Sequence, residues 1–510
     1  MKRTGLVFIF LMLTGLILSI SCGRGSENVP TTTTTTVLTT STTIPTGGNT
    51  YYLSPSGSDS NSGSETQPWK TFGHASETLQ PGDTLIIKDG TYILSDYNQD
   101  RLVPPSGTAS AWVVIKGETG KRPVLAGRGG MSHAIDISNK SYLLIENLEI
   151  TSDIDNPYSG GLQDGIEAGG SAGEGTGDIS NVILRNLCLH HIEQTGINFA
   201  GSIRDVTIEN LHIHHTGGPA LSAPAAGSGK KGWERVVISC CTLEYAGNFT
   251  NGEERRSDWD RPDGFGIEDS EGPIEIKYTT SRYNYGDGLD SKSRNTYIHH
   301  CIVANNFGDG VKLWGDGSKV ENTLVFGTSY PSNESTPWQL LVVDTDDTNA
   351  SIEVINCTFF DDERRANAQY VGTAQYQYWN VPIRLTLTNN IFAGLARFLI
   401  NKNVTLTAQN NLFYNRADAD GVQLEVVEGD PSNLNTYASY TSSNIASLGS
   451  GNIYGDPKFI RAEWGPNGDF HLQSGSPAID AGLSTGAPSD DLDGKVRPKS
   501  SAVDIGCYEK

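Results

Sequence analysis

Basic residues are scarce in this sequence of 510 residues. Its 37 lysines and arginines are outnumbered by 59 aspartates and glutamates, which gives a formal net charge of −22. Nucleic-acid binding depends on basic patches that neutralise phosphates, so we expect no nucleic acid among the partners. The acidity is compatible with bound divalent cations. It also means that any contact with a polyanion has to be local.

Charged residues of both signs are few, at 19%, whereas glycine is abundant, with 58 copies. This composition favours many short strands joined by turns over a helical protein. Cysteine is rare, and none of the seven cysteines forms a Cys-x-x-Cys pair, so a zinc site of that type is not indicated. We therefore expect an all-β fold in which the interior cysteines are small buried side chains.

Long apolar runs are missing except at the start of the chain, where Lys2 and Arg3 precede an apolar stretch that ends at Ile20. That stretch is too short for a membrane span and predicts a signal peptide over residues 1–21. The residues before Cys22 resemble a bacterial lipobox, which implies cleavage there and lipidation of the Cys22 thiol. The resemblance implies an exported protein held by its lipid to a membrane, at the cell surface or on the outer membrane. An ordinary signal peptide with secretion is the alternative.

Residues 22–49 are dominated by threonine, with an unbroken run from Thr31 to Thr36. Such a segment cannot bury enough apolar surface to fold, so it predicts a linker. The folded part opens near Tyr51 with a strand and a short helical stretch. This opening resembles that of extracellular right-handed parallel β-helix proteins, in which the helix caps the first coil.

Internal repeats extend through residues 50–415 and predict a solenoid. Alternating strands recur at about 22 residues or more, and several end in an asparagine such as Asn147, Asn186 or Asn210. The shortest repeat is too short for a propeller blade. We expect a right-handed parallel β-helix with stacked asparagines at its turns, then C-terminal coils and a cap over residues 416–510. We expect the chain to be a monomer.

Three consecutive coils align on Gly264, Gly288 and Gly310, which lie 24 and then 22 residues apart. In each coil the first and third residues after the glycine are mostly apolar and point inward. The second and fourth must therefore point outward. The outward set is Gly266, Asp290 and Lys312 at the second position, and Glu268, Lys292 and Trp314 at the fourth. The residues before the three glycines are Asp263, Asp287 and Asp309.

Neighbouring coils stack about 4.8 Å apart, so the four aspartates fall within one or two rungs of each other. Like charges at this spacing repel, and a divalent cation reverses the sign of that interaction. Carboxylate oxygens are the ligands that Ca²⁺ prefers. Lys312 lies beside the cluster, and a bound cation would lower its pKa, as a general base requires. Each Asp-Gly pair taken alone is also an ordinary turn former.

The segments Asp263-Gly264-Phe265, Gly286-Asp287-Gly288-Leu289-Asp290 and Gly308-Asp309-Gly310-Val311-Lys312-Leu313 resemble polysaccharide lyase family 9, the pectate-lyase-like β-helix enzymes. The resemblance implies Asp263, Asp287 and Asp290 as calcium ligands and Lys312 as the catalytic base. Asp309 joins the ligand set through the column described above. Two residues depart from the family pattern. Gly286 stands where another aspartate is usual, and Trp314 stands where a glycine is usual.

The function that these residues predict is calcium-dependent β-elimination on an acidic, uronate-containing polysaccharide. Substrate-binding candidates are the outward or nearby side chains, namely Glu268, Arg282, Lys292, Arg294 and Trp314. Two other classes stay open. The same aspartates can serve as the paired carboxylates of a glycoside hydrolase, and the chain can be a non-catalytic surface lipoprotein that binds glycans.

Overall fold

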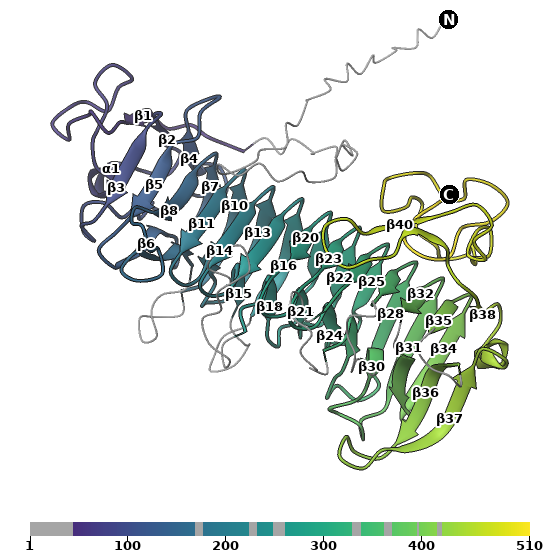
Figure 1. Cartoon of the computed structure of the whole chain (residues 1–510). Coiled ribbons are helices and arrows are strands. Elements are labelled where there is room, and N and C mark those ends of the chain that lie inside the picture. Colours follow the sequence, from purple (N-terminus) through teal and green to yellow (C-terminus); the bar gives the residue numbers. More distant parts are fainter. Residues whose placement is uncertain are drawn as a thin grey trace, which may run out of the picture.

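The computed structural model describes residues 44–168, 177–223, 232–247, 261–328, 338–361, 370–394, 397–415 and 421–510. They form a right-handed parallel β-helix, elongated along the axis of its coils (Figure 1), and this confirms the predicted fold class. The predicted signal peptide, the lipidation site Cys22 and nearly all of the predicted linker lie outside the described residues. Among the described residues, no helix has the length and apolar character needed to cross a membrane.

Three long sheets form the walls of the coil, and each coil contributes one strand to each sheet. The first sheet contains β1 (Thr50–Leu53), β2 (Thr84–Ile87), β4 (Val113–Gly117), β7 (Ser141–Glu146), β10 (Ile179–Arg185), β13 (Ile203–Glu209), β16 (Trp233–Ser239), β19 (Ile274–Lys277), β22 (Thr296–His299), β25 (Lys319–Glu321), β28 (Ser351–Ile355), β31 (Ile383–Thr388) and β34 (Val404–Gln409).

The second sheet contains β3 (Thr91–Leu94), β5 (Val124–Gly127), β8 (Glu149–Ser152), β11 (Cys188–Ile192), β14 (His212–Thr216), β17 (Thr242–Ala246), β20 (Thr280–Arg282), β23 (Ile302–Ala304), β26 (Leu324–Phe326), β29 (Thr358–Phe360), β32 (Ile391–Gly394), β35 (Leu412–Asn415) and β38 (Ile453–Tyr454). The third sheet contains β6 (Met131–Asp136), β9 (Leu162–Glu167), β12 (Ile197–Asn198), β15 (Leu221–Ala223), β18 (Phe265–Ile267), β21 (Leu289–Ser291), β24 (Val311–Leu313), β27 (Leu341–Val343), β30 (Tyr370–Ala374), β33 (Arg397–Asn401), β36 (Val422–Glu428) and β37 (Asn435–Thr441).

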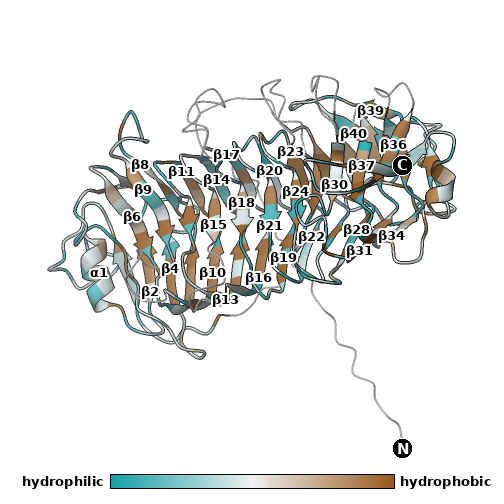
Figure 2. Ribbon diagram, turned by 90° about the horizontal axis from the view of Figure 1, so that it is seen from below, coloured by the Kyte–Doolittle hydropathy of each residue, from teal (hydrophilic) through white to brown (hydrophobic). Residues whose placement is uncertain are grey.

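Strand alternation explains why this sequence closes into a coil. In β10, Val182 and Leu184 are fully buried, while Arg185 points outward to an ion pair with Glu146 of β7. The inward side chains of all three sheets join one apolar core that runs from Leu53 to Ile445. Figure 2 shows apolar strands recurring in coil after coil along this length. Burial of that continuous core is the main force that holds the coils together.

Asparagines at the strand ends make the turns possible. Asn147, Asn186 and Asn210 adopt left-handed backbone conformations, with φ between 54° and 60°. Asparagine tolerates this conformation better than most residues. The Asn210 side chain donates a 2.7 Å hydrogen bond to the Asn186 carbonyl oxygen one coil earlier, so these asparagines stack as expected.

Both ends of the coil are covered. At the N-terminal end, α1 (Phe72–Thr78) begins after Thr71, whose hydroxyl accepts a hydrogen bond from the His74 backbone N–H, and it buries Phe72 and Ala75 in the core. At the other end, β37 pairs antiparallel with β36. The 3₁₀ helix η1 (Ile445–Leu448) then places Ile445 in the core.

The last residues return along the outside of the coil. The pair β39 (Phe459–Arg461) and β40 (Asp469–Leu472) packs Phe459 and Phe470 against Phe326 and Phe360 on the outer face of the second sheet. Figure 1 shows this C-terminal segment, in yellow, lying over that side of the coil. Residues 421–510, for which we expected coils and a cap, thus contain in addition a layer that shields one outer sheet face.

Asn411→Ala is expected to lower the free energy of unfolding by about 3 kcal/mol, because several buried polar groups lose their partners at once. The fully buried Asn411 amide donates to the Leu387 carbonyl oxygen at 2.8 Å and accepts from the Asn390 backbone N–H at 2.9 Å. Urea unfolding followed by circular dichroism measures the change. The exposed Asn98 is the matched control, and equal stability of Asn98→Ala and Asn411→Ala would contradict the assigned role.

Candidate functional site

The acidic coils lie side by side in the third sheet, in strands β18, β21 and β24. In this sheet Gly266 pairs with Asp290, and Asp290 pairs with Lys312, as the glycine alignment predicts. Phe265 and Leu289 are fully buried on the inward side. The second outward position therefore forms one column that faces solvent.

Three aspartates stack at the edge where these strands begin. The Asp263 carboxylate accepts a 2.6 Å hydrogen bond from the Asp287 backbone N–H, and Asp287 accepts a 2.7 Å bond from the Asp309 N–H. Asp309 in turn accepts a 2.6 Å bond from the Gln339 N–H. Each carboxylate thus fixes the turn of the next coil with one oxygen. The second oxygen of each stays available for other contacts.

Asp263, Asp287 and Asp290 converge on one point. Each offers a carboxylate oxygen, and these oxygens lie within 4.8 Å of one another. Asp290 is 5% exposed, and its Oδ1 atom is buried without a hydrogen-bond partner. An unpaired buried carboxylate oxygen is unfavourable unless something binds it. This donor set, made of hard oxygens with one left over, fits a Ca²⁺-like ion.

Lys312 extends its ammonium group into the same cluster. Its Nζ atom lies 2.5 Å from Asp287 Oδ2, 3.1 Å from Asp309 Oδ2 and 3.9 Å from Asp290 Oδ2. The side chain is 16% exposed, so these ion pairs are largely withdrawn from solvent. Lys312 therefore supplies the positive charge that holds the carboxylates together when no cation is bound.

Burial and mutual repulsion shift the pKa values in this cluster. Burial raises the pKa of Asp290 and of Asp309 to about 6, although Lys312 acts in the opposite direction. Burial, with the charges of Asp287 and Asp290, also raises the pKa of Asp263. For Lys312, burial acts to lower the pKa, but the three neighbouring carboxylates outweigh it and the pKa is raised. With these carboxylates ionised and no other cation present, Lys312 is a protonated partner rather than a base.

Two glycines shape the space around the carboxylates. A Cβ atom on Gly266 would lie 2.6 Å from Asp263 Oδ2, so the missing side chain leaves room for that carboxylate. A Cβ atom on Gly286 would lie 2.3 Å from the Arg261 carbonyl oxygen and from Asp263 Oδ1. The aspartate that the family pattern places at Gly286 therefore has no room here, because the backbone at Arg261 fills that position.

The fourth outward position flanks the cluster with a charged and an aromatic side chain. Lys292 Nζ lies 2.6 Å from Glu268 Oε1, 3.5 Å from Asp290 Oδ2 and 5.5 Å from the centre of the Trp314 ring. Trp314 meets the Tyr378 ring edge to face at 5.5 Å, and its indole N–H is buried without a partner. A pocket of about 170 Å³ opens beside them, lined among others by Asp263, Gly266, Glu268, Asp290 and Lys292.

Two of the predicted substrate-binding residues lie elsewhere. Arg282 belongs to β20 of the second sheet, where it pairs with Glu244 at 2.7 Å, so it does not face the acidic cluster. The corner between β20 and β21 turns the chain onto another wall of the coil. Arg294 follows β21, and its guanidinium is paired with Asp347 at 2.5 Å and Glu271 at 3.5 Å. It makes no ion pair with the cluster among the described residues.

The sequence alignment missed Asp344 and Tyr378 at the C-terminal side of the site. Leu313 pairs with Val343, so Asp344 falls next to Trp314 in the fourth outward column. The Asp344 carboxylate accepts hydrogen bonds from the backbone N–H groups of Gln377 (3.1 Å) and Tyr378 (3.3 Å). The step from β24 to β27 is 30 residues, from Val311 to Leu341, and that longer coil hides the repeat.

Comparison with known proteins supports the fold and part of the resemblance. Residues 51–232 match the family model described as "Pel9A-like, right handed beta helix region". A crystal structure of pectate lyase Pel9A superposes with a TM-score of 0.50 at 16% identity, over 91% of this chain and 97% of that chain. At this identity the superposition shows a shared fold. The family match ends before β18, so it does not cover the acidic cluster.

Two curated proteins share shorter segments. The uncharacterized protein YwoF of Bacillus subtilis is 34% identical over 80 residues, which is 16% of this chain and 16% of that protein. The lacto-N-biosidase of Bifidobacterium longum is 28% identical over 239 residues, covering 37% of this chain and 14% of that enzyme. The matched segments thus span under one fifth of either relative.

Gly266→Ala is expected to weaken Ca²⁺ binding by roughly 10–100-fold while the fold is kept, because the new methyl group displaces the Asp263 carboxylate. Isothermal titration calorimetry with CaCl₂ on chelator-treated protein measures the affinity. Gly47→Ala is the control, since a Cβ atom there meets nothing within 4 Å. Unchanged affinity in Gly266→Ala would remove Asp263 from the cation site.

The resemblance to the pectate-lyase-like β-helix proteins is therefore confirmed by the family model over residues 51–232 and by the fold over most of the chain.

Proposed function

We propose that this protein is a calcium-dependent polysaccharide lyase that cleaves an acidic, uronate-containing polysaccharide by β-elimination. The observation that carries the proposal is the convergence of Asp263, Asp287 and Asp290 beside Lys312 on one solvent-facing patch of the third sheet. Lyase chemistry on a uronate needs a cation for the sugar carboxylate and a base for the adjacent proton, and this patch holds candidates for both.

Asp263, Asp287 and Asp290 would hold the calcium ion, with Asp309 close behind them. The fit rests on the oxygen donor set and on the unpartnered, buried Oδ1 atom of Asp290. A bound calcium ion supplies positive charge that attracts the substrate carboxylate and stabilises negative charge as the neighbouring C–H bond breaks. The orphan oxygen then gains a partner, which removes an unfavourable feature of the ion-free protein.

Lys312 would accept the C5 proton of the uronate at its Nζ atom. The carboxylates of Asp309, Asp287 and Asp290 are what raise its pKa in the ion-free cluster. Neutralising those charges leaves burial as the dominant influence, and burial favours the uncharged amine. The aspartates thus hold Lys312 in position and also set its protonation state.

Lys292 and Trp314 would orient the sugar chain beside the base. Lys292 is held by Glu268 and Asp290, which fixes its ammonium at the border of the pocket. The Trp314 ring is braced by Tyr378 and offers an apolar surface of the kind on which sugar rings rest. Arg282 and Arg294 are not part of this arrangement.

Lys312→Ala is expected to lower kcat on polygalacturonate by roughly 10²–10⁴-fold, the contribution of a positioned general base. The ultraviolet absorbance of the unsaturated product measures the rate, with Ca²⁺ and with chelator. Lys319→Ala is the control, because Lys319 lies on the first sheet beside Tyr297 and Glu321. Full activity of Lys312→Ala would remove Lys312 from the base role.

Hydrolysis is the second candidate function. Asp290 and Asp309 have pKa values raised to about 6, which suits a carboxyl group that donates a proton to a leaving glycosidic oxygen. The same incubation separates the classes: a hydrolase produces reducing ends without ultraviolet absorbance, and a non-catalytic binder produces neither. Reducing ends without absorbance across a panel of polyuronates would contradict the lyase proposal.

A further inference from the structure

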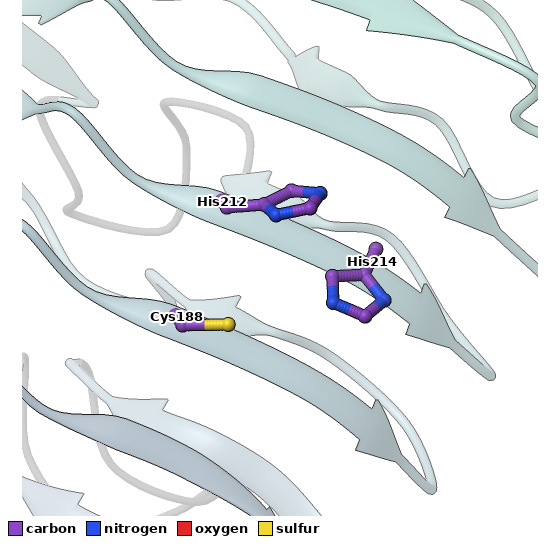
Figure 3. Close-up of side chains that lie close together, drawn as sticks. All are labelled: Cys188, His212 and His214. Carbon is purple, nitrogen blue, oxygen red and sulfur yellow. The ribbon is translucent and has the colours of Figure 1, made fainter. Parts of the chain in front are cut away.

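A second group of metal-type side chains lies on a different wall of the coil. His212 and His214 are two residues apart in β14, so they project from the same face of the second sheet. In the neighbouring strand β11, Cys188 pairs with His212 and His190 pairs with His214. Figure 3 shows His212 and His214 on one strand with Cys188 on the adjacent strand. The acidic cluster belongs to the third sheet, so the two groups are separate.

The imidazoles are close enough to share one ion. The ring centres of His212 and His214 lie 4.4 Å apart, and those of His190 and His214 lie 5.0 Å apart. Donor atoms of Cys188, His212 and His214 lie within 4.8 Å of one another. His214 is 7% exposed, and its Nε2 atom is buried without a hydrogen-bond partner. A buried ring nitrogen without a partner points to a missing ligand.

Carboxylates and a neighbouring ring fix the orientation of these histidines. His212 Nε2 lies 2.8 Å from Glu244 Oε1, so that nitrogen carries the proton and Nδ1 keeps its lone pair. Glu244 is itself held by Arg282 at 2.7 Å. His214 Nδ1 faces the Nδ1 of His215 at 2.8 Å, which leaves Nε2 for a ligand. A histidine whose second nitrogen donates to a carboxylate is the usual arrangement around a bound metal.

We propose that His190, His212 and His214 form a binding site for a divalent transition-metal ion of the zinc type on the outer face of the second sheet. Neutral imidazoles are preferred ligands of such ions, and three protein ligands leave one position open. Glu149, 3.2 Å from His190 Nε2, does for His190 what Glu244 does for His212. The two carboxylates also make the surroundings favourable for a dication.

Two candidates flank the histidine pair as third ligand. Cys188 forms a disulfide, so its sulfur is not available as a thiolate, and the assignment goes to His190. The Nδ1 atom of His190 contacts His191 Nδ1 at 2.8 Å and the Thr151 hydroxyl at 3.2 Å. Metal binding at His190 therefore requires these contacts to open, which is a local rearrangement of side chains.

Metal binding by the protein without reductant tests the proposal. Isothermal titration with Zn²⁺, after chelator treatment and in excess Ca²⁺ to fill the acidic cluster, is expected to show one tight equivalent. His214→Ala and His212→Ala should each abolish it. Glu244→Gln, which keeps the imidazoles, should weaken it by roughly 10–100-fold. His299→Ala is the control, since His299 lies on the first sheet beside Glu275 and should bind Zn²⁺ as the natural chain does.

Co²⁺ in place of Zn²⁺ identifies the ligands by absorption. Visible bands without a thiolate charge-transfer band are expected, and His190→Ala should remove them. A thiolate band would overturn the assignment of His190 in favour of Cys188. Absence of a tight Zn²⁺ equivalent, or equal binding by folded His214→Ala and His212→Ala variants, would overturn the site altogether. Both measurements read metal binding directly and are independent of any activity on polysaccharides.

Discussion

In-register stacking of successive coils is the constraint on which every other feature of this protein depends. Parallel pairing places equivalent residues of neighbouring coils about 4.8 Å apart, in columns that run along the axis. A column of apolar residues becomes core, and a column of asparagines becomes a ladder of turns. A column of aspartates becomes a concentration of negative charge that has to be offset.

The acidic coils offset that charge in three ways. Backbone N–H groups of the next coil bind one oxygen of Asp263, Asp287 and Asp309. Lys312 binds the oxygens that remain on Asp287 and Asp309. The Oδ1 atom of Asp290 is left over. The cluster is therefore complete as a piece of structure except at one atom, and that atom faces the point where a cation would bring the three carboxylates together.

The sequence was sufficient to predict the fold and the composition of the acidic column, because both follow from spacing. Glycines 24 and 22 residues apart predict that Asp290 and Lys312 are neighbours, and they pair in the sheet. Spacing fails where a corner or a long coil intervenes. Arg282 lies five residues before Asp287 along the chain, yet on another wall. Tyr378 meets Trp314 although two coils of uneven length separate them in sequence.

The histidine group had a signal in the sequence, since Cys188-x-His190 and His212-x-His214 stand 24 residues apart. It was passed over because the cysteines were sought in pairs and because histidines are common strand residues. The return of residues 456–510 over the second sheet had no periodic signal, since it depends on the contact of Phe470 with Phe326 and Phe360. Local pattern sets the coils, whereas packing between distant segments needs coordinates.

The central claim is that Asp263, Asp287 and Asp290 share one cation and thereby release Lys312 from its ion pairs. A crystal structure of the protein grown with Ca²⁺, with the ion located by anomalous scattering, tests it most directly. The account predicts one ion bonded to all three carboxylates, with the Asp290 Oδ1 atom among its ligands. A well-ordered site without an ion, with Lys312 still paired to Asp287 at saturating Ca²⁺, would contradict it.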